Sequence, residues 1–331
     1  MATYYAVAAG NFNATSTWST TPAGAAGFGP PIAGDTAVSN NRAVAVTASA
    51  TCLEVRNDTT GGATVGGTFT LAAGVTLTAN VYSGTANGIP CVTFAGASGS
   101  SAFLVGNIVA GSSSTIAGSA VTNTSTGTLN ITGNATGGTT SAHGISTTTA
   151  GIINITGNLT GGVSASGAYN NSTGTFNITG NVIGAGGNGV INNSTGTVNI
   201  VGQSKGSATG GTGAGVANIS TGTIIVTRAI GNGYGPGSAG LAAAVGVANS
   251  GLGVVGVEEL EYGTLGMSPT SGAGIRLKKL TSNVAIFNYC DTVGSKTLVD
   301  ATQGQMPAAT DVRFGTSYAS GALTGSAYIP S

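Results

Sequence analysis

Charged residues are scarce in this chain. Asp, Glu, Lys and Arg make up 5% of its 331 residues, as nine basic and nine acidic side chains, whereas they form about a quarter of an average soluble domain. From Thr59 to Thr227 the only charged residue is Lys205. Binding to phosphate needs arrays of Lys and Arg. The sequence therefore predicts no nucleic-acid partner.

Several other features are also missing. Aromatic residues are 5% of the chain, so Val, Ile, Leu and Ala, with a little Phe, must fill any core. The three cysteines, Cys52, Cys91 and Cys290, are far apart and are interpreted as small buried hydrophobes, not as a zinc site or a disulfide framework. No run of 18 apolar residues predicts a membrane span, and the first residues lack the pattern of a secretory signal. With 8 prolines and no G-X-Y period, collagen is excluded.

Glycine is abundant instead, at 59 residues, and it punctuates a repeat. The repeat glycines follow one another at intervals of 22 to 26 residues. The copies are TGTLNITGN (126–134), AGIINITGN (150–158), TGTFNITGN (173–181), TGTVNIVGQ (195–203) and the more divergent TGTIIVTRA (221–229).

Each copy alternates apolar and polar residues, which predicts a β-strand with one buried and one outward face. In the first copy Leu129 and Ile131 are expected inside, and Asn130 between them is expected outside. A second, shorter strand is expected to precede each copy. Fainter copies extend upstream at GVTLTAN (74–80) and SAFLVGN (101–107), and CLEVRN (52–57) is a candidate for the first.

Repeats of this length bury their apolar face by stacking on one another. Parallel pairing of each strand with its counterpart would align identical residues in ladders about 4.8 Å apart, with Asn amides hydrogen-bonded along the stack. Like charges would repeat in every turn, which accounts for their absence. The sequence predicts an all-β fold, a right-handed parallel β-helix of about eight turns. Residues 51–256 would form the helix, with an N-terminal cap at 1–50 and a β-rich C-terminal cap or docking domain at 257–331.

Candidate catalytic groups are few. His143, the only histidine, lies in a variable corner with no acid in its own or the adjacent turns. Cleavage of a glycoside takes two carboxylates, and no acid occurs between Asp58 and Glu258. Glu259 and Glu261 are the one candidate pair, interpreted as part of a solvated cap strand. A T-x-T pattern, as in Thr126 and Thr128, could form a threonine array like that of ice-binding solenoids, but Ala150 and Ile152 interrupt it. We expect no enzyme, no cofactor and no metal site.

Distinctive segments lie at both ends of the chain. They are STWST (16–20), PPIAGDTAV (30–38) and VTASATCLEV (46–55) near the N-terminus and MPAATDVRFGTSYASGALTGSAYIPS (306–331) at the C-terminus. These segments resemble parts of virion structural proteins of tailed bacteriophages. The resemblance implies a β-helical component of the virion surface, a capsid decoration (cement) protein or a tail fibre, and a homotrimer. It carries no catalytic residues to this chain.

The leading hypothesis is a cement protein that binds the major capsid protein or another virion protein and stabilises the phage head. The alternative is a tail fibre or host-adhesion protein that binds a surface glycan, for which Tyr169, Tyr234 and Tyr262 are the candidate aromatics. The apolar stretch 240–257 is compatible with contact between copies. Docking is assigned to a cap, with five charged candidates: Arg276, Lys278, Lys279, Asp311 and Arg313.

Overall fold

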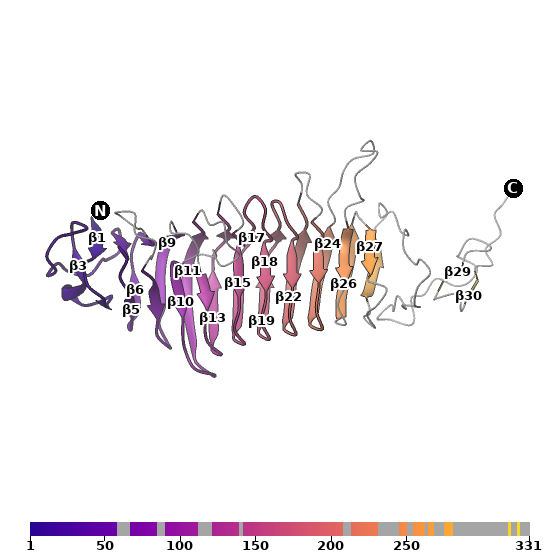
Figure 1. Cartoon of the computed structure of the whole chain (residues 1–331), viewed down its shortest axis with the longest axis horizontal. Helices are drawn as coiled ribbons and strands as arrows, with labels where there is room; N and C mark the ends of the chain where they lie inside the picture. The colour runs from indigo at the N-terminus through magenta and orange to yellow at the C-terminus, as the bar shows by residue number, and fades with distance from the viewer. Residues whose placement is uncertain are drawn as a thin grey trace.

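A computed structural model shows a rod of stacked β-strands that follow one another along its long axis (Figure 1). It describes residues 1–57, 67–84, 90–111, 121–138, 142–207, 213–230, 245–249, 254–261, 264–267, 275–280, 317–318 and 323–324. Within these residues the only helix is a 3-10 turn at Thr15–Thr17. No helix among them is long and apolar enough to cross a membrane.

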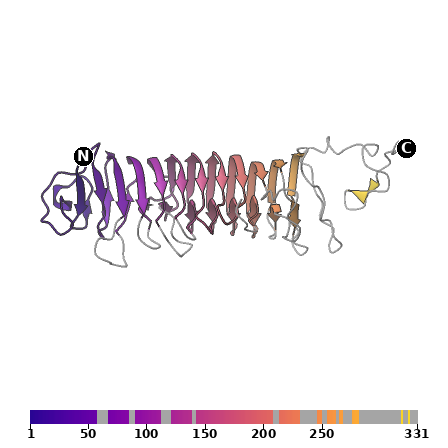
Figure 2. The same cartoon turned by 90° about the horizontal axis from the view of Figure 1, so that it is seen from above.

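The largest sheet has 17 strands and runs along the rod (Figure 2). Its strands are β1 (Thr3–Ala6), β3 (Trp18–Ser19), β4 (Thr36–Val38), β6 (Ala50–Thr51), β7 (Glu54–Asn57), β9 (Thr76–Gly84), β11 (Ser101–Val109), β13 (Thr128–Thr132), β14 (Ala135–Thr136), β16 (Ile152–Thr156), β17 (Leu159–Thr160), β19 (Thr175–Thr179), β20 (Val182–Ile183), β22 (Thr197–Lys205), β24 (Thr223–Ile230), β26 (Val254–Glu261) and β28 (Ile275–Leu280).

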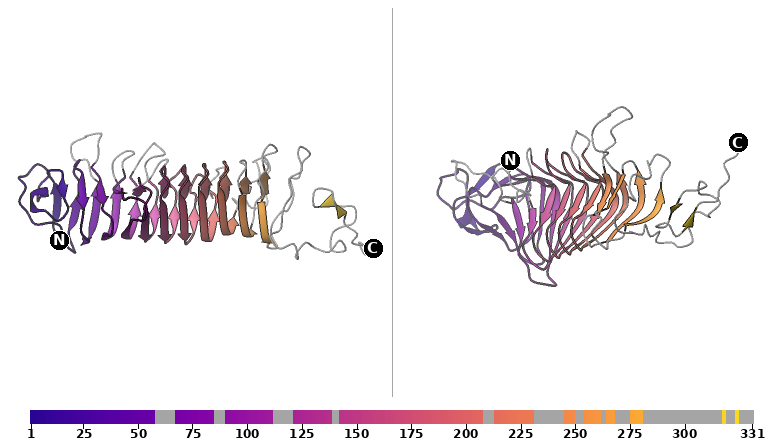
Figure 3. Two further views of the ribbon diagram at one scale, coloured as in Figure 1. Left: turned by 90° about the horizontal axis from the view of Figure 1, so that it is seen from below. Right: turned by 45° about the vertical axis from the view of Figure 1, so that its right-hand side comes forward.

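Two further sheets form another side of the rod (Figure 3). The five-stranded sheet contains β2 (Gly10–Asn11), β5 (Val44–Val46), β8 (Phe69–Leu71), β10 (Val92–Phe94) and β12 (Val121–Asn123). The six-stranded sheet contains β15 (Ile145–Thr147), β18 (Ala168–Asn170), β21 (Val190–Asn192), β23 (Val216–Asn218), β25 (Val245–Asn249) and β27 (Thr264–Met267). Near the C-terminus β29 (Ser317–Tyr318) pairs with β30 (Leu323–Thr324).

A turn of the solenoid is built from three strands in succession, as β18, β19 and β20 illustrate. Each pairs in parallel with its counterpart in the next turn: β18 with β21, β19 with β22, and β20 with the second half of β22. The register keeps equivalent residues together, since Asn177 pairs with Asn199 and Ile178 with Ile200. The predicted parallel β-helix is confirmed, and its ladders are in the expected register.

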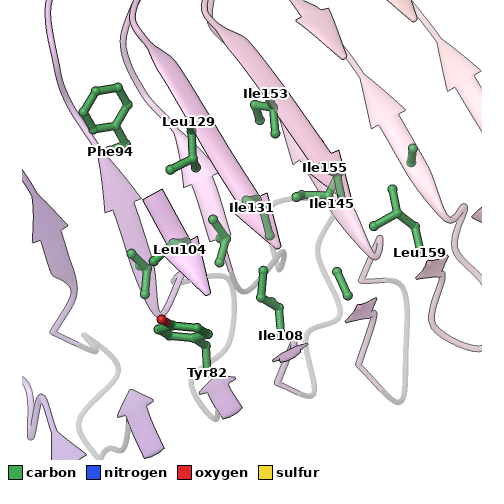
Figure 4. Close-up of a cluster of buried hydrophobic side chains, with 14 of the residues drawn as sticks. Tyr82, Phe94, Leu104, Ile108, Leu129, Ile131, Ile145, Ile153, Ile155 and Leu159 are labelled. Atoms are coloured by element: carbon green, nitrogen blue, oxygen red, sulfur yellow. The ribbon is translucent and has the colours of Figure 1, made fainter. Parts of the chain in front are cut away.

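The core is a set of apolar columns inside the coil. Leu129 and Ile131 lie in register with Ile153 and Ile155, and all four side chains are buried. Figure 4 shows these four residues on neighbouring strands, with Phe94, Leu104 and Tyr82 among the other buried residues of the cluster. Because each inward residue contacts its counterparts above and below, burial of β-branched and Leu side chains, with a few aromatic ones such as Phe94 and Phe176, stabilises the stack.

A cluster of aromatic residues also lies at the N-terminal end. Trp18 is fully buried and lies edge-on to Phe12, with ring centroids 5.3 Å apart, and stacked on Phe69 at 6.5 Å. Its indole Nε1 donates to the backbone oxygen of Phe12 at 2.6 Å. The strand that carries Trp18, β3, pairs antiparallel with β1. The antiparallel strand and the aromatic cluster close this end of the solenoid, which otherwise would expose an unpaired strand edge and apolar rings.

The structure shows how the upstream segments predicted from the sequence pair with one another. GVTLTAN and SAFLVGN join the ladder as expected, since Leu77 pairs with Leu104. CLEVRN differs: Asn57 pairs with Gly84, not with Asn80, so this segment matches the third strand of the turn. Parallel pairing also occurs on both sides of the expected 51–256 segment, from β1 with β4 to β26 with β28.

Candidate functional site: the Asn/Thr face

One face of the rod is formed by the outward residues of the second strand in each turn. We call it the Asn/Thr face and define it by the outward residues of β9, β11, β13, β16, β19, β22 and β24. Its residues are Thr76, Thr78, Ser101, Phe103, Val105, Thr128, Asn130, Thr132, Ile152, Asn154, Thr156, Thr175, Asn177, Thr179, Thr197, Asn199, Val201, Thr223, Ile225 and Thr227. None of them is charged.

The centre of the face is an asparagine ladder. Asn154 Nδ2 donates to Asn130 Oδ1 at 2.9 Å, Asn177 Nδ2 donates to Asn154 Oδ1 at 2.9 Å, and Asn199 Nδ2 donates to Asn177 Oδ1 at 2.8 Å. The amides therefore satisfy one another along the stack, and the predicted ladder is confirmed. The chain of bonds fixes every side-chain amide in one orientation, so the face is rigid as well as uncharged.

A glycine ladder borders the face where the second strand turns into the third. Gly157 and Gly180 have φ of 153° and 147°, a region that favours glycine. A Cβ atom on Gly180 would lie 2.1 Å from the backbone oxygen of Gly157. Glycine is therefore required here both by conformation and by the close approach of the preceding turn.

A second, buried asparagine ladder holds the corner between the first and second strands. Asn170 Nδ2 donates to the oxygen of Gly174 at 3.3 Å, and its Oδ1 accepts from the nitrogen and Oγ of Ser172 at 3.2 and 2.9 Å. Ser172 Oγ in turn accepts from the nitrogen of Gly174 at 3.0 Å. The same Asn-to-Gly bond recurs from Asn123, Asn192 and Asn218.

Sequence reasoning treated these asparagines only as part of a short strand. The signal that could have identified the corner is the spacing N-x-S-T-G, repeated at 123–127, 170–174, 192–196 and 218–222. These asparagines are also the first residues of N-x-S sequons, yet they are fully buried. Their sequence pattern therefore serves the fold and gives no acceptor for a glycan in the folded chain.

His143 and Tyr169 form a stacked pair on the first-strand side of the rod. Their ring centroids are 4.6 Å apart and the planes differ by 7°. His143 is buried and its Nδ1 accepts from the nitrogen of Ser166 at 3.1 Å. Burial lowers the pKa of the imidazole, since desolvation penalises the charged ring. Asn193 Nδ2 donates to the hydroxyl of Tyr169 at 3.2 Å, so the half-buried tyrosine has a polar partner at its exposed end.

The predicted docking residues fall in or beyond the last turns. Arg276, Lys278 and Lys279 lie on β28, where Arg276 pairs with Gly256 and Lys279 with Glu259. Through Gly256 and Ile225, Arg276 continues the backbone column of the asparagine ladder. Asp311 and Arg313 lie outside the described residues, as do two of the candidate aromatics, Tyr234 and Tyr262. The structure therefore brings three of the five docking candidates onto one strand.

The acidic residues of the described turns lie in two places: Asp35 and Glu54 are near the N-terminal end, and Glu258, Glu259 and Glu261 are on β26. Asp35 Oδ1 accepts from the nitrogen of Ala2 at 2.8 Å and its Oδ2 accepts from that of Ile32 at 3.3 Å, so this carboxylate ties the start of the chain to the first turns. Glu54 Oε1 accepts from Ser83 Oγ at 2.6 Å. On β26, Glu259 pairs in register with Arg228 and Glu261 with Ile230. No group of His, Cys, Asp and Glu that could hold a metal occurs among the described residues.

The cysteines for which the structure gives side chains are inert by environment. Cys52 and Cys91 are buried and free of disulfides, while Cys290 lies outside the described residues. Burial, reinforced by the negative charges of Asp35 and Glu54, raises the pKa of Cys52 to about 12. Burial also raises the pKa of the Cys91 thiol. Neither thiol forms the thiolate needed for nucleophilic or redox chemistry at neutral pH.

Comparisons with protein families, with curated proteins and with solved structures found no match to this chain.

Proposed function

We propose that the chain is a structural protein of a virion surface, a capsid decoration protein that binds the head and projects from it. The observation that carries the proposal is the uncharged, rigid Asn/Thr face on a rod closed at its N-terminal end. Both asparagine ladders of the described turns use their side-chain amides to hold the fold. A rigid, uncharged rod of this kind fits a structural role better than a catalytic one.

Rigidity and binding to assembled subunits fit a stabilising role. A protein that bridges neighbouring subunits of the assembled shell, and does not bind free subunits, shifts the equilibrium toward the shell. Attachment to the major capsid protein by the last turns, where Arg276, Lys278 and Lys279 lie on β28, would leave the N-terminal cap projecting. Three copies would match a three-fold position of the shell. The proposal includes no catalytic activity and no cofactor.

Cryo-electron microscopy of intact particles tests this proposal, with particles that lack the gene for this chain as the control. We expect rod-shaped density at three-fold positions of the head that is missing from the control, and lower resistance of the control heads to heat. Density on the tail, or no difference between the two particles, would refute the decoration role.

A second function, host adhesion through a glycan, is favoured by one observation. Tyr169 presents a half-buried ring that is held flat by His143 and bonded to Asn193, and aromatic rings with polar partners are common in ligand sites. A glycan-binding assay would compare Tyr169→Ala with Tyr5→Ala, a half-buried tyrosine on β1. Loss of binding in the first variant alone would support adhesion, and the absence of binding by the wild-type chain would exclude it for the glycans tested.

A further inference from the structure

We propose that the Asn/Thr face is the surface through which copies of this chain associate with one another. The inference rests on the proposed structural role and gives that role a contact surface. It differs from the expectation that copies meet through the apolar stretch 240–257, and it places the contact on the middle of the rod.

The first argument is exposed apolar surface. Large hydrophobic side chains interrupt the polar ladders toward both ends of the face and once in its middle, and all of them are exposed to solvent in the single chain. They are Phe103 and Val105 on β11, Ile152 on β16, Val201 on β22 and Ile225 on β24. Phe103 and Val105 share one strand, and Val201 and Ile225 lie on neighbouring strands. Exposed apolar groups that gather in this way favour contact with another surface.

The second argument is the absence of charge. Exposed sheets usually carry Lys or Glu side chains that keep copies apart. The residues of the Asn/Thr face are all uncharged. The described charges that border the face are Lys205 and Arg228, on the third-strand portions of β22 and β24, and Arg276, two strands beyond Ile225 in the same backbone column. Two such faces can therefore approach without repulsion or the cost of desolvating charges.

The third argument is the repeat itself, which points to a second copy as the occupant. The outward columns recur at the spacing of paired strands, about 4.8 Å. A second copy presents the same spacing, so each turn of one copy meets a turn of the other in the same way. A partner whose surface groups do not recur at intervals of about 4.8 Å could match one turn of the face but would be out of register at the next turn.

The size of the face fits an interface. The face is as wide as a strand of five residues, about 16 Å, and as high as the stack of strands from β9 to β24, about 30 Å. Its projected area is therefore on the order of 500 Å². Side-chain relief raises the accessible area above this value, toward the about 800 Å² that each partner contributes to a standard interface.

The test uses two double variants that carry the same charge and differ in the face that they occupy. Val201→Lys with Ile225→Lys places two lysines on the Asn/Thr face. Val163→Lys with Ile219→Lys is the matched control at the corners, because the exposed fractions are 66% and 50% in the first pair and 65% and 48% in the second. Sedimentation equilibrium over a concentration series measures the mass, and circular dichroism checks the fold.

We expect the wild-type chain and the control to sediment at a multiple of 31.4 kDa, and the face variant at 31.4 kDa. A monomeric wild-type chain, an unchanged mass in the face variant, or equal loss in both variants would overturn the inference. Particle imaging tests the virion role separately, so either conclusion can fail while the other stands.

A milder pair of variants decides the matter if the lysines disturb folding. Thr179→Cys lies on the Asn/Thr face, and Thr173→Cys lies at an exposed corner. Maleimide labelling of Thr179→Cys should be several-fold slower than that of Thr173→Cys in concentrated protein, and the difference should disappear on dilution. Equal rates at every concentration would overturn the proposal.

Discussion

The N-terminal cap and the repeated turns are stabilised in different ways. In the cap, Trp18, Phe12 and Phe69 make contacts that occur once in the molecule. In the turns from β13 to β22, the same Asn–Asn and Ile–Ile contacts recur in successive levels. Loss of a contact in the cap cannot be compensated by an equivalent contact elsewhere. A residue inside a ladder, in contrast, contacts equivalent residues in the turns on both sides. The difference shows that closure of the end depends on particular residues and extension depends on repetition.

The strongest test of this contrast is disruption of the aromatic cluster of Trp18, Phe12 and Phe69. Trp18→Ala should lower the free energy of unfolding by about 4 kcal/mol, because a fully buried indole is replaced by a cavity. Urea unfolding followed by circular dichroism measures the change. Trp18→Phe is the control: it keeps a ring but loses the hydrogen bond to Phe12, and it should cost less. Equal stability of Trp18→Ala and the wild-type chain would show that the end is closed by other contacts.

A glycine of the ladder should respond almost as strongly. Gly180→Ala would force a side chain into a φ of 147° and against the backbone of Gly157, at a cost of about 3 kcal/mol. Gly99→Ala is the matched control, with a φ of 80° and no atom within 4 Å of the new Cβ. It should cost about 1 kcal/mol. Chemical unfolding of both variants separates backbone conformation from steric contact, and equal losses would contradict the argument.

The two asparagine ladders should differ from each other. Asn170→Ala leaves the buried partners at Ser172 and Gly174 without their bonds, so we expect a loss of about 2 kcal/mol. Asn177→Ala removes an outward, partly solvated amide and should cost about 0.5 kcal/mol. Thermal unfolding of the two single variants gives the comparison. A larger loss from the outward residue would show that the surface ladder, and not the corner, holds the turns together.

The smallest effect concerns pH. The pKa of His143 is lowered in the folded chain, so the unfolded chain binds a proton more readily. Stability from the neutral imidazole is therefore complete above the unfolded pKa of about 6.5 and decreases as the pH falls toward the folded pKa. The melting temperature should drop between about pH 7.5 and about pH 5. His143→Phe should reduce this dependence, and an identical pH profile would assign it to other groups.

The sequence predicted the features that recur with period two. Leu129, Asn130 and Ile131 alternate over a strand of five residues, Thr128–Thr132, long enough to show which side each residue faces. The third strand of the turn could not be located, because a segment such as Val182–Ile183 has two residues and no period. Pairing across turns was also hidden where corners vary in length: His143 and Tyr169 stack although they lie in different turns. Trp18 lies in the segment STWST, but its stacking partner Phe69 is distant in sequence and the contact could not be predicted.

The glycine ladder has a consequence for how such a chain changes length. Each turn joins the next through identical backbone approaches, as Gly157 does with Gly180. A complete turn can thus be duplicated or deleted without creating a new kind of junction. The height of the rod then changes in steps of about 4.8 Å. The aromatic cluster at the N-terminal end and the strands β26 and β28 at the other end keep their structures. The number of turns therefore sets the distance between the two ends of the rod.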